Sequence, residues 1–215
     1  EFRIDDDLPE VAIDMNDGGD GVFDGNDFFL FYAPGPDQWI FQPTTSEFGF
    51  QKNPYSDQSF YFINIGNTPG KRITEMPVVS NSSTVVVDFD EHYRHELDSI
   101  NFLRSGKEWY GEPFGTQSGK LSSRDFNLNF SGAVVGTDFT LHSEVVGRSF
   151  EQPNRMPVLL NGQTLFEHST PPLVGTLLEP AANMSRKSGK GKLTGNGLVV
   201  GYKLNGGSAS AEAWL

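Results

Sequence analysis

Short runs of apolar residues, separated by turn-forming residues, recur along the chain and predict β-strands. Residues 126–130 place Phe, Leu and Phe at every second position with polar residues between them, which is typical of a half-buried strand. An Asn-Gly pair at 161–162 lies between two apolar runs and predicts a hairpin. The predicted strands are 28–32, 39–41, 59–65, 84–89, 126–130, 137–146, 156–160, 163–166 and 193–204.

One segment departs from this pattern. Tyr93, Leu97, Ile100 and Leu103 follow one another at spacings of four, three and three residues, which places them on one face of a helix. Gly106 follows as a typical helix stop. We therefore predict one short helix near 91–104 within an all-β fold. The fold expected is an antiparallel β-sandwich of the jelly-roll or Ig-like type.

Composition excludes several classes of protein. The 215 residues contain no cysteine, so the chain has no disulfide, no Cys-ligated metal and no thiol nucleophile. The formal net charge of −12 argues against nucleic acid as a partner, because phosphate contacts need a surplus of Lys and Arg. No apolar run approaches the 18 or so residues of a transmembrane helix, so we expect no membrane span.

The negative charge is concentrated at the N-terminus. Residues 1–51 hold 12 acidic residues and one basic residue, whereas the rest of the chain is nearly neutral. We divide the chain into an acidic N-terminal β segment (1–80) and a β-sandwich body (81–215), with one continuous domain (1–215) as the alternative. The last residues, Ala213-Trp214-Leu215, suggest a piece of a longer protein.

Residues 14–27 read DMNDGGDGVFDGND and form a candidate calcium loop. Calcium takes six to eight oxygen ligands, and glycines permit the tight turns that gather them. The EF-hand pattern matches only in part, because Gly25 stands at its twelfth position, where a bidentate Glu is required. The alternative is a solvated loop whose side chains cap its own turns. The candidate ligands are Asp14, Asn16, Asp20, Asp24 and Asp27.

No motif predicts an enzyme. The four histidines lack the HExxH spacing, and neither a G-x-S-x-G nor a Walker A sequence occurs. Aromatic residues are instead the candidates for binding, because flat rings stack on sugar faces and on protein partners. We single out Trp39, Trp109 and Tyr110, for which core packing is the alternative.

Four blocks of the sequence resemble a known family in order and spacing. They are GDGVFDGNDFFLFYAPGPDQW, ending at Trp39, then QKNPYSDQSFYFINIG (51–66), HELDSINFLRSGKEWYGEPF (95–114) and AEAWL (211–215). These resemble the non-catalytic N-terminal region of type IX secretion system sortases, which are gingipain-like cysteine peptidases of the C25 family in Bacteroidetes. The role of the SGKEWYGEPF block stays open between a docking surface and a corner of the core.

The resemblance implies a function without catalysis in this chain. The family's catalytic Cys and His belong to a downstream α/β domain, so none of its catalytic residues is carried over. The chain would be an accessory β domain of a cell-surface sortase that cleaves C-terminal signals and attaches cargo at the outer membrane. Its partners would be its own peptidase domain, outer-membrane secretion partners or secreted cargo. The alternative is a carbohydrate-binding module with structural calcium that recognises surface polysaccharide.

Overall fold

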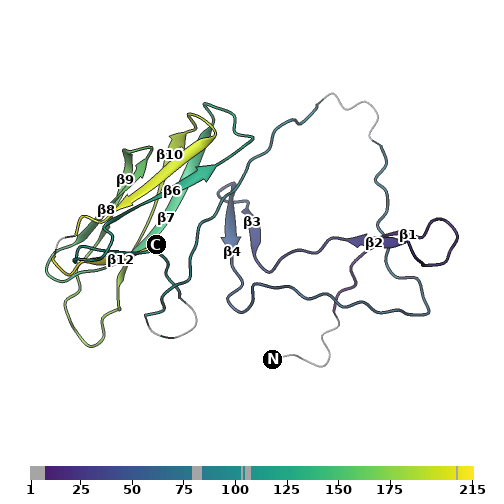
Figure 1. Cartoon of the computed structure of the whole chain (residues 1–215), viewed down its shortest axis with the longest axis horizontal. Coiled ribbons are helices and arrows are strands. Elements are labelled where there is room, and N and C mark those ends of the chain that lie inside the picture. Colours follow the sequence, from purple (N-terminus) through teal and green to yellow (C-terminus); the bar gives the residue numbers. More distant parts are fainter. Residues whose placement is uncertain (1–7, 79–83, 103, 105–107, 207) are drawn as a thin grey trace. The chain divides into compact units, whose positions relative to one another are not determined.

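The computed structural model describes residues 8–78, 84–102, 104, 108–206 and 208–215. The chain forms two compact units, unit 1 (residues 1–90) and unit 2 (residues 91–215). The domain boundary predicted between residues 80 and 81 stays a prediction, because residues 79–83 lie outside the described part. The strands (Figure 1) are β1 (Ile13–Asn16), β2 (Phe28–Phe31), β3 (Gln38–Gln42), β4 (Glu47–Gln51), β5 (Pro113–Gly115), β6 (Ser123–Asn129), β7 (Asp138–Arg148), β8 (Asn154–Leu160), β9 (Gln163–Thr170), β10 (Asn183–Lys192), β11 (Gly197–Lys203) and β12 (Glu212–Trp214).

Unit 2 consists of two four-stranded antiparallel sheets. The strand order is β10-β7-β12-β5 in one sheet and β6-β11-β8-β9 in the other. The longest ladder joins β7 to β10, from Asp138 opposite Lys192 to Gly147 opposite Asn183. The predicted antiparallel β-sandwich is confirmed.

The core of unit 2 follows from the alternation in the sequence. In β6, half-buried residues alternate with exposed ones along the whole strand, as the period of two predicts. Val158, Val200 and Phe114 are almost completely buried between the sheets. The predicted hairpin is also confirmed: β8 and β9 are joined at Asn161 and Gly162, which both have positive φ angles, of 47° and 84°, as a type I′ turn requires.

The helix predicted near 91–104 is wrong. Residues 91–102 and Arg104 contain no helix, only a single turn in which the Arg104 N–H donates to the Asn101 carbonyl at 3.4 Å, and Leu103 lies outside the described residues. Ile100 instead forms an antiparallel bridge with Tyr110, and each backbone N–H donates to the other residue's carbonyl at 2.9 Å. A backbone committed to a distant partner cannot also form the local bonds of a helix. Within the described residues, no helix is long and apolar enough to cross a membrane.

A buried histidine joins the two sheets of unit 2 through hydroxyl groups. His168 of β9 is 1% exposed. Its Nδ1 lies 2.9 Å from Ser185 Oγ of β10, and its Nε2 lies 3.0 Å from Ser143 Oγ of β7. Tyr202 of β11 donates its hydroxyl to the same Ser143 Oγ at 2.8 Å. Each sheet therefore contributes two side chains to one continuous polar network, which we call the His168 network.

Burial holds the His168 network in its neutral form. Desolvation is the main cause, and the positive charge of Lys187 is the smaller one; together they lower the pKa of His168 from 6.5 to about 4. Its partners in the network are hydroxyl groups, which compensate a positive charge much less than a carboxylate does. The sandwich is therefore built around an uncharged imidazole.

We predict that unit 2 loses stability as the pH falls from about 6.5 to about 4. In the unfolded chain His168 takes up a proton near its ordinary pKa of 6.5, whereas in the folded chain its pKa is about 4. The contribution of neutral His168 to the free energy of unfolding is fully present above pH 6.5. Its loss below the folded-state pKa amounts to about 3 kcal/mol. Urea unfolding followed by circular dichroism at several pH values measures it. The His168→Gln variant should lose this pH dependence, and the exposed-site control His92→Gln should keep it. An equal dependence in His168→Gln would contradict the prediction.

Candidate functional site

Two short β-ribbons carry the aromatic residues of unit 1. In the β3–β4 ribbon, Trp39 lies opposite Phe50 and Phe41 lies opposite Phe48. The ring centroids of the two pairs are 5.1 Å and 5.2 Å apart, so four rings share one face as cross-strand pairs. Trp39, a candidate binding residue, thus lies in an aromatic row and not alone.

The β1–β2 ribbon carries a second aromatic cluster. The ring of Phe29 lies 6.3 Å from Phe23 and 6.2 Å from Phe31, and Phe31 makes an edge contact with Tyr61 at 5.4 Å. The Tyr61 hydroxyl donates to the Pro34 carbonyl at 2.6 Å. This hydrogen bond fixes a distant part of unit 1 beside the end of β2.

Unit 1 has no buried core among its described residues. None of the residues in 8–78 and 84–90 is buried, although many are large and apolar. The strands predicted at 59–65 and 84–89 are wrong, because neither segment is in a strand; Ile65 is 96% exposed and Val87 87%. A β-prone segment becomes a strand only when another strand supplies hydrogen bonds. Unit 1 therefore presents strand-forming apolar sequence to its surroundings.

The acidic loop that joins β1 to β2 bonds to its own backbone. Asn16 Oδ1 accepts from the Gly18 N–H at 3.2 Å, and Asp20 Oδ1 accepts from Val22 at 2.9 Å. Asp27 Oδ2 accepts from the N–H of Asp24 at 2.6 Å. These bonds are the turn caps of the alternative interpretation.

The candidate calcium ligands are not gathered into one cluster. Asp14 lies within β1, opposite Leu30, whereas Asp20 and Asp24 belong to the loop. In the part of the chain that the structure describes, no three His, Asp or Glu side chains are placed to share a metal ion. Calcium binding stays a prediction.

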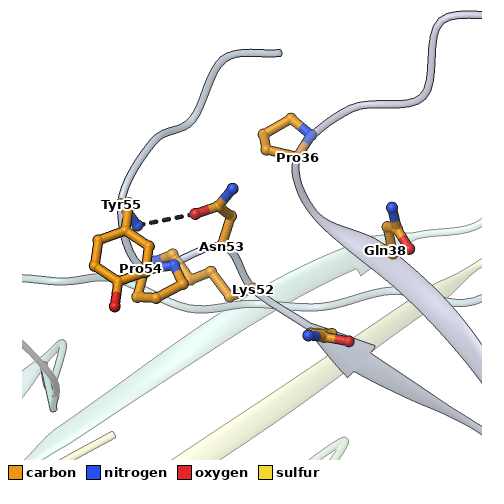
Figure 2. Close-up of a pocket in the computed structure, with 7 residues that line it drawn as sticks. Pro36, Gln38, Lys52, Asn53, Pro54 and Tyr55 are labelled. Atoms are coloured by element: carbon orange, nitrogen blue, oxygen red, sulfur yellow. Dashed lines mark hydrogen bonds between the residues drawn. The ribbon is translucent and has the colours of Figure 1, made fainter. Parts of the chain in front are cut away.

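A polar pocket of about 300 Å³ opens at the ends of β3 and β4 (Figure 2). Gln38 and Gln51 lie opposite each other there. Asn53 fixes the adjacent turn: its backbone N–H donates to Asp37 Oδ1 at 2.9 Å, and its Oδ1 accepts from the Tyr55 N–H at 2.9 Å. The lining offers amides, an ammonium group and a phenol ring from Pro36, Gln38, Gln51, Lys52, Asn53, Pro54 and Tyr55.

The described part of the SGKEWYGEPF block, residues 108–114, forms a corner of unit 2. Tyr110 is half-buried, contacts the ring of Phe102 at 5.2 Å and donates its hydroxyl to Glu108 at 3.2 Å. Burial first, and then the charge of Glu108, raise the pKa of Tyr110. Gly111 is required beside it, because a Cβ there would lie 2.5 Å from the carbonyl oxygen of Leu97. Trp109, by contrast, is 46% exposed. One candidate residue therefore supports the corner, and its neighbour faces outward.

Two polar groupings were missed by reasoning from the sequence. His95 Nε2 lies 2.6 Å from Glu112 Oε1, and Glu112 is only 9% exposed. The second grouping is the His168 network. The bonded residues in these groupings are 17 to 59 positions apart in the sequence, so no local sequence motif predicts them. His95 and Glu112 therefore form a hydrogen-bonded histidine–carboxylate pair at the corner.

The fold resembles that of a solved protein over almost the whole chain. No family model matches the chain, and no curated protein matches it. The crystal structure of dimeric latent PorU from Porphyromonas gingivalis matches with a TM-score of 0.64 and 16% identity, over 97% of this chain and 19% of that one. The chain thus has a PorU-like fold and spans about a fifth of that protein's length. The EclA C-terminal domain, a sugar-binding protein, matches with a TM-score of only 0.33 and 14% identity, over 55% of this chain and 94% of that one.

We predict that calcium relieves repulsion in the acidic loop and raises the melting temperature of the chain. The loop and its flanking strands hold five aspartates between residues 14 and 27 without a basic residue, and a divalent cation would offset their mutual repulsion. Calorimetric titration with calcium chloride, and melting in calcium against EDTA, measure this. The Asp20→Asn/Asp24→Asn variant should lose the response, whereas Asp125→Asn in β6 should keep it. If the titration shows no heat of binding and the melting temperatures in calcium and in EDTA are equal, the prediction is wrong, and the aspartates serve only to cap the turns of the loop.

Proposed function

We propose that this chain is a non-catalytic β-rich accessory domain of a gingipain-like type IX secretion sortase and that it acts by protein–protein contact. The PorU-like fold over 97% of the chain supports the proposal that the chain is a domain of such a sortase. The observation that carries the mode of action is the combination, in unit 1, of exposed aromatic residues and no buried residue among those described. We therefore assign the binding of partners to the exposed surface of unit 1.

The energetics favour a protein partner for this surface. Burying one large apolar side chain contributes about 1.5–3 kcal/mol, and aromatic residues are enriched at the centres of protein interfaces. Phe60, Phe62 and Ile65 are all more than 70% exposed, so a partner that covers them gains several such contributions. Large apolar side chains that are exposed in such numbers are typical of interaction sites.

Catalysis is assigned to another part of the parent protein. This chain has no cysteine. His168 is sealed between the sheets. His95 bonds to Glu112, and a histidine–carboxylate pair can supply a base but not the cysteine nucleophile that such a peptidase needs. The partners proposed are the parent's own peptidase domain, outer-membrane secretion partners or secreted cargo, and the site of action is the cell surface.

Carbohydrate binding is a second candidate, favoured by the polar pocket of unit 1. The paired amides of Gln38 and Gln51 can each donate and accept hydrogen bonds, as sugar hydroxyls require. Tyr55, which is 93% exposed, offers a ring on the pocket wall. This arrangement can hold a sugar by one stacked face and several hydrogen bonds.

We predict that the parent protein loses processing of protein cargo when the surface of unit 1 is changed. The coding sequence is expected to continue beyond Leu215 into an α/β domain with a catalytic Cys and His. In that protein, Phe62→Ser/Ile65→Ser should slow maturation of cargo about tenfold or more, because two buried anchors are worth at least 1.4 kcal/mol. Hydrolysis of a short peptide substrate should be unchanged. Immunoblots of cargo and a fluorogenic peptide assay give the two rates.

A matched control for this experiment lies in unit 2. Leu177 and Leu178 are as exposed as the changed residues, so Leu177→Ser/Leu178→Ser should leave both rates unchanged. A stop codon directly after Leu215, or equal loss of peptide hydrolysis in Phe62→Ser/Ile65→Ser, would contradict the proposal.

For the second candidate, we predict saturable retardation of the chain in gels that contain surface polysaccharide. Tyr55→Ala should abolish the retardation, because it removes the stacking ring of the pocket. Trp39→Ala and Trp109→Ala report on the other candidate aromatic residues. Equal mobility with and without polysaccharide would remove carbohydrate binding from consideration.

A further inference from the structure

The hydrogen bonds of β1 reveal which edge of the β1–β2 ribbon is open. The Ile13 N–H donates to the Lys71 carbonyl at 3.1 Å, and the Ile13 carbonyl accepts from the Ile73 N–H at 2.9 Å. Along a strand, the N–H and C=O of one residue point to the same side, and successive residues alternate. Ile13 and Met15 therefore face residues 71–73, whereas Asp14 and Asn16 face β2.

The register then fixes the other edge of the ribbon. Asp14 lies opposite Leu30 and Asn16 lies opposite Phe28. The backbone N–H and C=O groups of Leu30 and Phe28 therefore point toward β1. Phe29 and Phe31 consequently direct their N–H and C=O groups to the outer edge of β2. Among the described residues, no strand pairs with this edge.

One face beside the open edge is apolar. Phe28 and Leu30 project from the same face of β2 and are both exposed, and Tyr32, directly after the strand, is 80% exposed. Asp14 shares this face, because directly opposite residues of an antiparallel pair lie on the same side. A strand added at the outer edge would therefore place alternate side chains over Phe28 and Leu30.

The acidic and basic residues around the ribbon lie at different places. The loop leading into β2 contains Asp17, Asp20, Asp24 and Asp27, and none of the described residues forms an ion pair with them. The basic residues Lys71 and Arg72 lie at the opposite edge, beside Ile13 of β1. The acidic loop closes one end of the ribbon (Figure 1), so a strand added along the open edge of β2 would have acidic residues at one of its ends and no basic residue of β2 beside it.

We propose that the outer edge of β2 docks an extended segment of a separate protein in which apolar and basic side chains alternate. Backbone hydrogen bonds to Phe29 and Phe31 extend the ribbon by one strand. The apolar side chains cover Phe28 and Leu30, and the basic ones, which project from the opposite face, offset the charge of the loop at the end of the ribbon. This inference rests on the proposed function, because it names the chemistry of one protein partner.

A second copy of this chain is a poor occupant of the same edge. Pairing of β2 with β2 would supply backbone partners but no positive charge, because residues 14–32 contain no basic residue. The aspartates of both copies would stay uncompensated. A basic segment has the opposite sign and gains from the same arrangement.

The test uses the whole chain in EDTA, so that calcium cannot occupy the loop. The probe is a blocked eight-residue peptide of alternating valine and lysine, titrated by calorimetry. We expect saturable binding that weakens as salt is added, since exposed charge pairs are screened. Two matched peptides should not bind: one with glutamate in place of lysine, and one with alternate backbone amides N-methylated, which keeps the charge and removes the strand-pairing donors.

Variants of the chain locate the site. Asp20→Asn/Asp24→Asn should weaken binding of the valine–lysine peptide about 3–10-fold, and the control Asp125→Asn/Glu151→Gln in unit 2 should leave it unchanged. Equal binding of the glutamate or N-methylated peptide would overturn the inference, as would the absence of saturable binding to the unchanged chain. Sedimentation showing that the chain self-associates through this edge would also overturn it.

The proposed function and this inference can fail separately. If no peptide binds, while Phe62→Ser/Ile65→Ser still slows cargo processing in the parent protein, the docking inference is wrong and the proposed function stands. If the valine–lysine peptide binds as expected, while cargo processing is normal in that variant, the edge is a strand-docking site whose role lies outside cargo maturation.

Discussion

The exclusion of water from between two sheets is the constraint on which the rest of the structure depends. Every buried residue among those described lies in unit 2, where Val158, Val200 and Phe114 fill the space between the layers. Glycines permit the close approach of the layers: a Cβ at Gly147 of β7 would lie 2.1 Å from Thr170 Oγ1, and one at Gly189 of β10 would lie 2.5 Å from the ring of Phe166. Packing of this density sets the register of both sheets, since a shift of one residue would turn every inward side chain outward.

The same dry interior explains the form of the polar groups it contains. An unpaired polar group in such a place is costly, so buried networks are stable only when their members satisfy one another. The His168 network meets this condition with serine and tyrosine hydroxyl groups from both sheets. Its geometry also ties one sheet to the other at a fixed position. The lowered pKa of His168 is a consequence of that burial.

The sequence predicted what depends on neighbours along the chain and missed what depends on distant contacts. The alternation in β6 and the Asn161-Gly162 turn are local, and both were confirmed. The helix near 91–104 was wrong because Ile100 bonds to Tyr110, a contact that a helical stripe cannot reveal. The polar pocket of unit 1 was missed for the same reason: it depends on the pairing of β3 with β4. For the candidate calcium ligands, composition identified the loop but not the direction of its side chains, which bond to the loop's own backbone.

The two units carry apolar patterns of similar strength, yet only one of them uses its pattern to build a core. Residues 59–65 are as rich in aromatic and branched side chains as β11, but Ile65 is almost fully exposed, whereas Val200 is 4% exposed. An apolar alternation states that one face will be covered and says nothing about what covers it. In unit 2 the cover is the opposite sheet. For unit 1 we propose that the cover is a partner protein, and the charge of the acidic loop limits the choice of partner. A partner that covers this surface must bring both apolar side chains and positive charge, because an apolar partner alone would leave the loop's aspartates to repel one another in a less polar environment.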